Sequence, residues 1–208
     1  MLLRYPLNRI KITQGFGERP EVYKPFRGHM GIDFRTIWND SPSGMRSVYA
    51  AASGKVLMGN QGKSGYGKFV KIRHSDHSET IYGHLSDWSV EEGQLVIVGE
   101  RIGISGTTGF SSAPHLHFGY RPPNFNPHDD FGGYINPLPF MTTELFEPYF
   151  EQVKGQNIIA FYKKSIDMMV PFDDGDDFKS LFGDYQNILV NNVEKWSRPL
   201  ASKKLLIA

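Results

Sequence analysis

The chain carries two clusters of metal-binding residue types that its fold must bring together or leave apart. His29 and Asp33 lie near the start, and His115 and His117 follow about eighty residues later. Imidazole nitrogens and a carboxylate are the ligands that zinc takes in catalytic sites, where a fourth position stays open for water. Alternate residues of a strand point to one face, so His115 and His117 can enter one site together. We therefore predict that the two clusters meet at a zinc site.

Glycines surround the first of these clusters. The run Gly28-His29-Met30-Gly31-Ile32-Asp33 contains two of them, and glycine permits backbone conformations that other residues avoid. We expect a sharp loop in which His29 and Asp33 fold toward one point.

Short β-prone runs separated by glycine turns dominate the first two-thirds of the chain. Their lengths and turn signals predict a mainly β fold with an antiparallel, sandwich-like sheet rather than alternating strands and helices. Residues 121–137, rich in proline, asparagine and glycine, are expected to form a loop that leaves the core. The candidate strands are Lys11–Thr13, Ser47–Ala50, Lys55–Met58, Lys68–Arg73, Thr80–His84, Gln94–Val96, Arg101–Ser105 and His115–Tyr120.

The last third of the chain has a different pattern. Apolar residues recur at helical spacing and predict a helix from about Asp176 to Ser197, with acidic residues at its start and basic residues at its end. We therefore divide the chain into a domain at 1–140 and a C-terminal helical extension at 141–208. The apolar stripe of this helix predicts packing on the β domain, self-association or a partner chain.

Composition excludes several classes of function. A formal net charge of +1 argues against nucleic-acid binding, which normally requires a basic excess. The chain has no cysteine, so disulfides, thiolate zinc ligands and a cysteine nucleophile are all excluded. No stretch reaches the ~20 apolar residues of a membrane-spanning helix. The first residues show no apolar segment with a cleavage site, which favours delivery by a phage, or a signal peptide already removed.

Six stretches together resemble a known family, over roughly residues 10–120 and in that family's order. They resemble the lysostaphin-type, or LytM-like, zinc metalloendopeptidases, which cut peptidoglycan peptides. The stretches are Gly28-His29-Met30-Gly31-Ile32-Asp33-Phe34, Val48-Tyr49-Ala50-Ala51-Ala52-Ser53-Gly54-Lys55-Val56, Gly65-Tyr66-Gly67-Lys68-Phe69-Val70, Tyr82-Gly83-His84-Leu85-Ser86, Gly103-Ile104-Ser105-Gly106-Thr107-Thr108-Gly109 and Pro114-His115-Leu116-His117-Phe118.

The resemblance implies a role for each site residue. His29, Asp33 and His117 would bind zinc, and a zinc-bound water would be the nucleophile of a zinc-dependent peptidoglycan endopeptidase acting at the bacterial cell wall. His115 would be the general base and His84 the group that positions or stabilises, although the reverse division stays open. Tyr23 would either donate to the oxyanion or pack in a loop.

Several alternatives stay open at this point. The chain could be a non-catalytic peptidoglycan-binding or regulatory relative, or a phage virion component that carries the peptidase domain. The bond cut could be glycyl-glycyl or D-alanyl–diaminopimelate. His74, His77 and His128 lie outside the matching stretches, and we predict that they are polar surface residues. Residues 173–177 are acidic, but they lack the spacing of a calcium loop, so we interpret them as a solvated helix cap.

Overall fold

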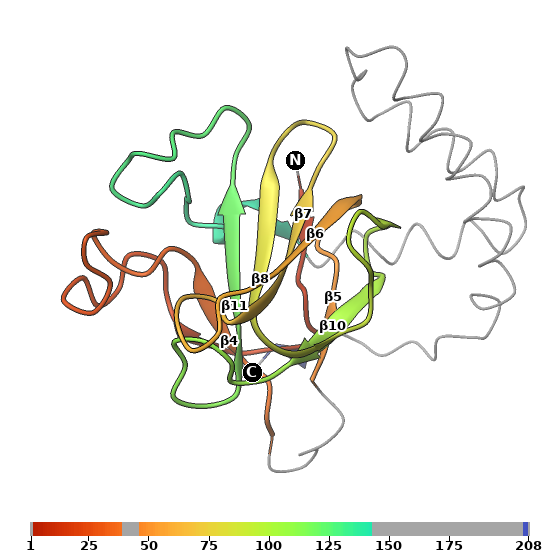
Figure 1. The fold of residues 1–208 in the computed structure, drawn as a ribbon, viewed down its shortest axis with the longest axis horizontal. Helices are drawn as coiled ribbons and strands as arrows, with labels where there is room; N and C mark the ends of the chain where they lie inside the picture. Colours follow the sequence, from red (N-terminus) through yellow and green to blue (C-terminus); the bar gives the residue numbers. More distant parts are fainter. Residues whose placement is uncertain (1, 39–45, 143–205, 208) are drawn as a thin grey trace, which may run out of the picture. The chain divides into compact units, whose positions relative to one another are not determined.

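The computed structural model describes residues 2–38, 46–142 and 206–207. The predicted mainly β fold is confirmed, since strands make up almost all of the regular structure in these ranges (Figure 1). The strands are β1 (Leu3–Arg4), β2 (Arg9–Ile10), β3 (Ile12–Gln14), β4 (Ile32–Arg35), β5 (Ser47–Tyr49), β6 (Gly54–Asn60), β7 (Lys68–Arg73), β8 (Glu79–Trp88), β9 (Leu95–Val96), β10 (Arg101–Ser105), β11 (His115–Arg121), β12 (Met141–Thr142) and β13 (Leu206–Ile207).

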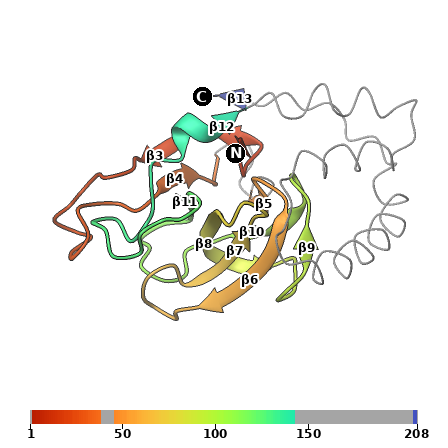
Figure 2. The ribbon, with the colours of Figure 1, turned by 90° about the horizontal axis from the view of Figure 1, so that it is seen from above.

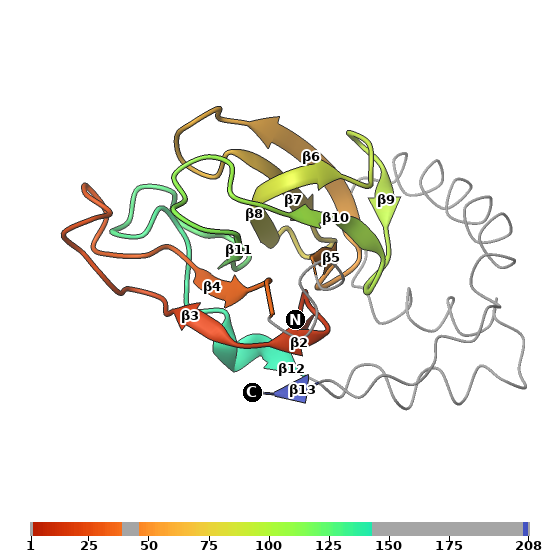
Figure 3. The same ribbon diagram turned by 90° about the horizontal axis from the view of Figure 1, so that it is seen from below.

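One large antiparallel sheet organises the described residues. Its strand order is β3-β4-β11-β8-β7-β6-β9, and β10 joins it by pairing with both β8 and β5. Figure 2 shows β6, β7 and β8 side by side, with β3, β4 and β11 continuing the sheet from them. There are also two short parallel pairs, β1 with β12 and β2 with β13, and Figure 3 shows β2 and β13 near each other.

Burial on both faces explains why the central strands do not alternate in polarity. Residues 79–85 of β8 are all buried, and so are residues 116–120 of β11. The core is formed by apolar side chains from these strands and from the segments that cover them, among them Leu3, Ile32, Phe34, Val48, Val70, Tyr82, Leu85, Ile102, Leu116 and Phe118.

A buried polar network lies where β7 turns into β8, and it corrects one of our predictions. His74 is not a surface residue, because only 2% of it is exposed. Its Nδ1 donates to the carbonyl of Ser53 at 2.8 Å, and its Nε2 lies 2.9 Å from the Thr80 hydroxyl. That hydroxyl lies 3.0 Å from the hydroxyl of Tyr82. His77 and His128 are exposed, as predicted.

The segment after β11 is a loop, as predicted, but it returns to the core. Ile135 forms a bridge with Tyr120, and Tyr134 is only 4% exposed. A 3-10 helix, Leu138–Phe140, then leads into β12. The predicted helix at 176–197 lies outside the described residues, as does most of the predicted extension at 141–208. In the part of the chain that is described, no helix has the length and hydropathy needed to cross a membrane.

Candidate metal centre

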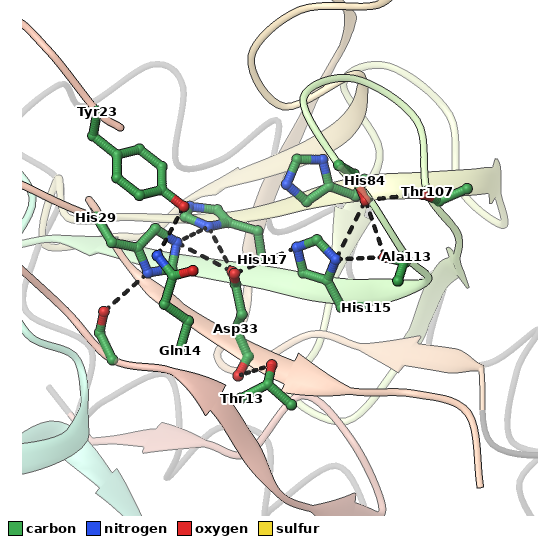
Figure 4. Close-up of polar contacts among 12 residues, drawn as sticks. Thr13, Gln14, Tyr23, His29, Asp33, His84, Thr107, Ala113, His115 and His117 are labelled. Atoms are coloured by element: carbon green, nitrogen blue, oxygen red, sulfur yellow. Dashed lines mark hydrogen bonds and ion pairs between the residues drawn. The ribbon is translucent and has the colours of Figure 1, made fainter. Parts of the chain in front are cut away.

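Three buried side chains point their ligand atoms at one another (Figure 4). His29 Nε2 lies 2.8 Å from His117 Nδ1, and each of these nitrogens lies 3.1 Å from Asp33 Oδ1. Ligands of a tetrahedral zinc ion stand about 3.3 Å apart, given zinc–nitrogen and zinc–oxygen bonds of about 2.0–2.1 Å. A nearly equilateral triangle with sides of 2.8–3.1 Å therefore fits three of the four positions around zinc.

Strand pairing sets this geometry. Asp33 lies on β4 and His117 on β11, and the two residues are direct partners in the antiparallel register. This corrects the prediction of a loop that holds both residues. Asp33 is part of a regular strand, and His29 alone lies in the loop before that strand. Gly31 has no room for a side chain, because a Cβ atom there would lie 2.7 Å from the Cε1 atom of His117.

The ring of His29 is held in one tautomer. Its Nδ1 lies 3.0 Å from the carbonyl oxygen of Gly15, so Nδ1 carries the proton and donates it. The lone pair of Nε2 then faces the triangle, which is the arrangement that metal-binding histidines need.

The other two members of the triangle also suit a cation. Burial raises the pKa of the Asp33 carboxyl, but the neighbouring imidazoles of His117 and His29 outweigh it and hold that pKa well below its usual range. Burial lowers the pKa of His117. The Nε2 atom of His117 is buried and has no hydrogen-bond partner among the described residues. A carboxylate and two imidazoles are thus brought together.

A β-bulge directs His84 toward this triangle. Strand β8 pairs with β7 at Tyr82 and at Leu85, and the register shifts between these two residues. His84 lies between them with a φ of +61°, a left-handed conformation that is rare outside glycine. Bulges re-aim side chains and recur beside active sites. The ring of His84 comes to 5.9 Å from that of His117, measured between centroids.

His84 is also held in one tautomer. Its Nδ1 donates to the carbonyl of Thr108 at 2.7 Å, which leaves Nε2 without a proton. Burial, followed by the neighbouring His117 and His115, lowers the pKa of His84 to about 4. The imidazole is therefore neutral at pH 7.

His115 completes the group of imidazoles. Its Nδ1 donates to the carbonyl of Ala113 at 2.8 Å and lies 3.3 Å from the Ser111 hydroxyl. Its Nε2 lies 3.4 Å from Asp33 Oδ2, and its ring centroid lies 4.6 Å from that of His84. The structure thus places all five predicted site residues in one cluster, with His84 and His115 beside the triangle.

Residues 27–130, half of the chain, match the model of peptidase family M23. The chain belongs to this family.

Curated relatives of this M23 chain include peptidoglycan enzymes. The chain is 41% identical over 114 residues to "DD-carboxypeptidase/endopeptidase Mpg" of Neisseria meningitidis and 38% identical over 122 residues to "Peptidoglycan DD-endopeptidase ShyB" of Vibrio cholerae. The matches cover 54% and 55% of this chain, but only 25% and 26% of those proteins. The chain therefore spans about a quarter of the length of these relatives.

A solved structure agrees with the fold of this M23 chain. The catalytic domain of lysostaphin from Staphylococcus simulans is similar with a TM-score of 0.51 and 33% identity. The similarity covers 63% of this chain and 91% of that domain. M23 metallopeptidases are zinc enzymes, so the predicted cofactor agrees with both the family and the His–Asp–His triangle.

Two tyrosines flank the triangle. The ring of Tyr23 lies 5.1 Å from the ring of His29, and the ring of Tyr66 lies 5.2 Å from that of His117. The carbonyl of Tyr66 also accepts the backbone N–H of His84 at 2.7 Å. Tyr66 stands in one of the stretches that resemble the family, but no site role was predicted for it. The glycines on either side of it, Gly65 and Gly67, have φ values of +47° and +59°.

Proposed function

We propose that this protein is a zinc-dependent endopeptidase that hydrolyses peptide bonds of bacterial peptidoglycan. The observation that carries the proposal is the triangle of His29, Asp33 and His117 with two further imidazoles beside it. A site that only stored a metal would have no use for His84 and His115. The printed names of the relatives, which include peptidoglycan DD-endopeptidases and lysostaphin, support peptidoglycan as the substrate.

Zinc would be held by His29 Nε2, Asp33 Oδ1 and His117 Nδ1. When bound, zinc supplies Lewis acidity toward a peptide carbonyl and lowers the pKa of water. The carbonyl of Gly15 keeps the Nε2 lone pair of His29 directed at this position.

We assign proton abstraction to His115. Its Nδ1 already donates to Ala113, so Nε2 is the atom that can take a proton from the attacking water. This atom lies 3.4 Å from Asp33 Oδ2, at the edge of the triangle. General-base assistance of this kind typically accelerates a reaction by ~10²–10⁴-fold.

We assign a positioning role to His84. With a pKa of about 4, its imidazole is a weaker base than an ordinary histidine, but its Nε2 can accept a hydrogen bond from the attacking water. Since Thr108 fixes the ring, that acceptor is already oriented before substrate binds. The hydroxyl of Tyr23 is the group available to donate to the oxyanion.

Digestion of purified peptidoglycan tests the proposed function. The zinc-loaded full chain would be incubated with peptidoglycan that has glycine cross-bridges and with peptidoglycan that has direct D-alanyl–diaminopimelate cross-links. Mass analysis of the fragments then identifies the bond cut. We expect cleavage of at least one type, with none after chelation or in an Asp33→Ala variant. Failure of the zinc-loaded protein to cut either type would refute the proposal.

The place of action is part of the same proposal. A peptidoglycan endopeptidase acts at the cell wall, so this chain would work outside the cytoplasmic membrane. Self-association or a virion partner of the C-terminal segment stays a prediction of the sequence.

A further inference from the structure

Three consecutive residues at the edge of the sheet each hold a group of the candidate active site. On β3, the Thr13 hydroxyl donates to the carbonyl of Asp33 at 3.3 Å. The next residue, Gln14, donates from Nε2 to the hydroxyl of Tyr23 at 2.8 Å. Gly15, directly after the strand, accepts from His29 Nδ1. The contacts of Thr13 and Gly15 support two proposed metal ligands, whereas the contact of Gln14 supports Tyr23.

The direction of the Gln14 contact decides where the Tyr23 proton can go. A tyrosine hydroxyl has one proton to donate and also accepts hydrogen bonds. When the hydroxyl of Tyr23 accepts from the amide of Gln14, its own proton stays available for another acceptor. Figure 4 shows Gln14 next to the hydroxyl of Tyr23, while the tyrosine ring packs on His29.

The surroundings of Tyr23 make this proton useful at the candidate active site. Its ring is partly buried against a metal ligand. Its hydroxyl accepts the hydrogen bond from Gln14, and its ring packs beside His29, so Tyr23 borders the triangle. A preorganised donor aimed at a developing oxyanion is among the largest contributions to catalysis.

We infer that Gln14 is a positioning residue: it binds the Tyr23 hydroxyl as a donor and so leaves the tyrosine proton free for the oxyanion of the scissile peptide. This inference rests on the proposed function and refines it. Gln14 itself touches neither the metal triangle nor the reacting atoms.

Two size-matched substitutions separate orientation from packing. In Gln14→Glu the carboxylate accepts a hydrogen bond from the Tyr23 hydroxyl, which turns the hydroxyl proton away from the oxyanion. In Gln14→Met the donor is lost, but nothing competes for that proton. We expect kcat to fall by about 10²-fold in Gln14→Glu, as in Tyr23→Phe, because one oxyanion donor is removed. Gln14→Met should lose about tenfold or less, the worth of one hydrogen bond. KM should change little, since the donor acts in the transition state.

A double-mutant cycle shows whether Gln14 acts through Tyr23. In a Tyr23→Phe background, Gln14→Glu should lower kcat no further, because there is no proton left to redirect. Zinc content should equal that of the wild type in all four proteins. If Gln14→Glu remains as harmful without the tyrosine hydroxyl, or if it matches the wild type, the inference is wrong.

An NMR measurement tests the inference independently of activity. The zinc-loaded full chain would be labelled with ¹³C at the tyrosine Cζ atoms, and the Tyr23 signal identified by its loss in Tyr23→Phe. At neutral pH, Gln14→Glu should shift this signal toward the phenolate value, because Tyr23 now donates to a carboxylate. Gln14→Met should not produce that shift. An unchanged signal in Gln14→Glu would overturn the inference even if the protein cleaves peptidoglycan. The expected shift would support it even if no cleavage is seen and the proposed function fails.

Discussion

The Nδ1 atom of His84 lies 2.7 Å from the carbonyl oxygen of Thr108, and this contact decides which ring nitrogen of His84 can act on substrate. Gly15 and Ala113 do the same for His29 and His115. Three of the four imidazoles of the site thus donate Nδ1–H to a backbone carbonyl and turn Nε2 toward the other site residues. Backbone carbonyls therefore orient these rings before any ligand arrives.

Removal of any ligand in the triangle should remove the metal. We expect the wild type to bind about one zinc per chain, and His29→Ala, Asp33→Ala and His117→Ala to bind none under the same conditions, because two ligands hold zinc poorly. Elemental analysis after dialysis measures this directly. His128→Ala, at an exposed position, is the matched control and should keep its zinc. Stoichiometric zinc in Asp33→Ala would show that the ligand assignment is wrong.

The accessory histidines should separate metal binding from turnover. His115→Ala and His84→Ala should each keep one zinc and lose about 10²–10⁴-fold in kcat, the range of general acid–base assistance. Zinc content and peptidoglycan cleavage would be measured on the same preparations. A zinc-free preparation of either variant would identify that residue as a ligand and contradict the assigned roles.

The left-handed backbone at His84 predicts an unusual order of stability. His84→Gly should be more stable than His84→Ala by about 1 kcal/mol, because only glycine adopts a φ of +61° without steric cost. Both variants lack the imidazole, so their difference reports the backbone alone. The free energy of unfolding would be measured by urea denaturation. At Ser86, an exposed residue of β8, the order should be reversed: Ser86→Ala should be more stable than Ser86→Gly. Equal stability of the two His84 variants would argue against strain.

The buried imidazole of His74 predicts a loss of stability in mild acid. Burial lowers its pKa from the ordinary value of 6.5, whereas the unfolded chain titrates normally. Below about pH 6.5 the unfolded state therefore binds more protons, and the free energy of unfolding falls as the pH drops. Metal-free wild type and His74→Gln would be unfolded in urea between about pH 7.5 and 5. We expect a flatter pH dependence in His74→Gln, and an unchanged one in the exposed control His128→Gln. Identical slopes for wild type and His74→Gln would contradict this prediction.

The sequence predicted most of the strands of the sheet, but it did not predict β4 or the burial of His74. All eight candidate strands are present, because β-prone runs and glycine turns are local signals. Strand β4 escaped notice since it has only four residues. Two glycines before it also pointed to a loop. The buried state of His74 could not be predicted either, because its partners Ser53 and Thr80 meet it only through strand pairing.

Some residues of the candidate site could be predicted from sequence spacing, and others could not. His29, Asp33, His115 and His117 stand in spacings that carry chemical meaning, and the structure brings them together. The roles of Tyr66 and Gln14 could not be predicted, because their contacts with His117 and Tyr23 form only when separate segments meet in the folded chain. The left-handed conformation of His84 could not be predicted from the sequence either, since histidine gives no local signal for a bulge.

The pairing of Asp33 with His117 across β4 and β11 has a consequence for how the chain reaches its native state. A slip of one residue between two strands sends every side chain of one strand to the opposite face. A misaligned pair would therefore place these two residues on opposite sides of the sheet, where they could not share an ion. A zinc ion held by both residues would bind only where they share a face, so it would lower the free energy of the native alignment relative to that slip. Metal binding would thus stabilise the native register of β4 and β11.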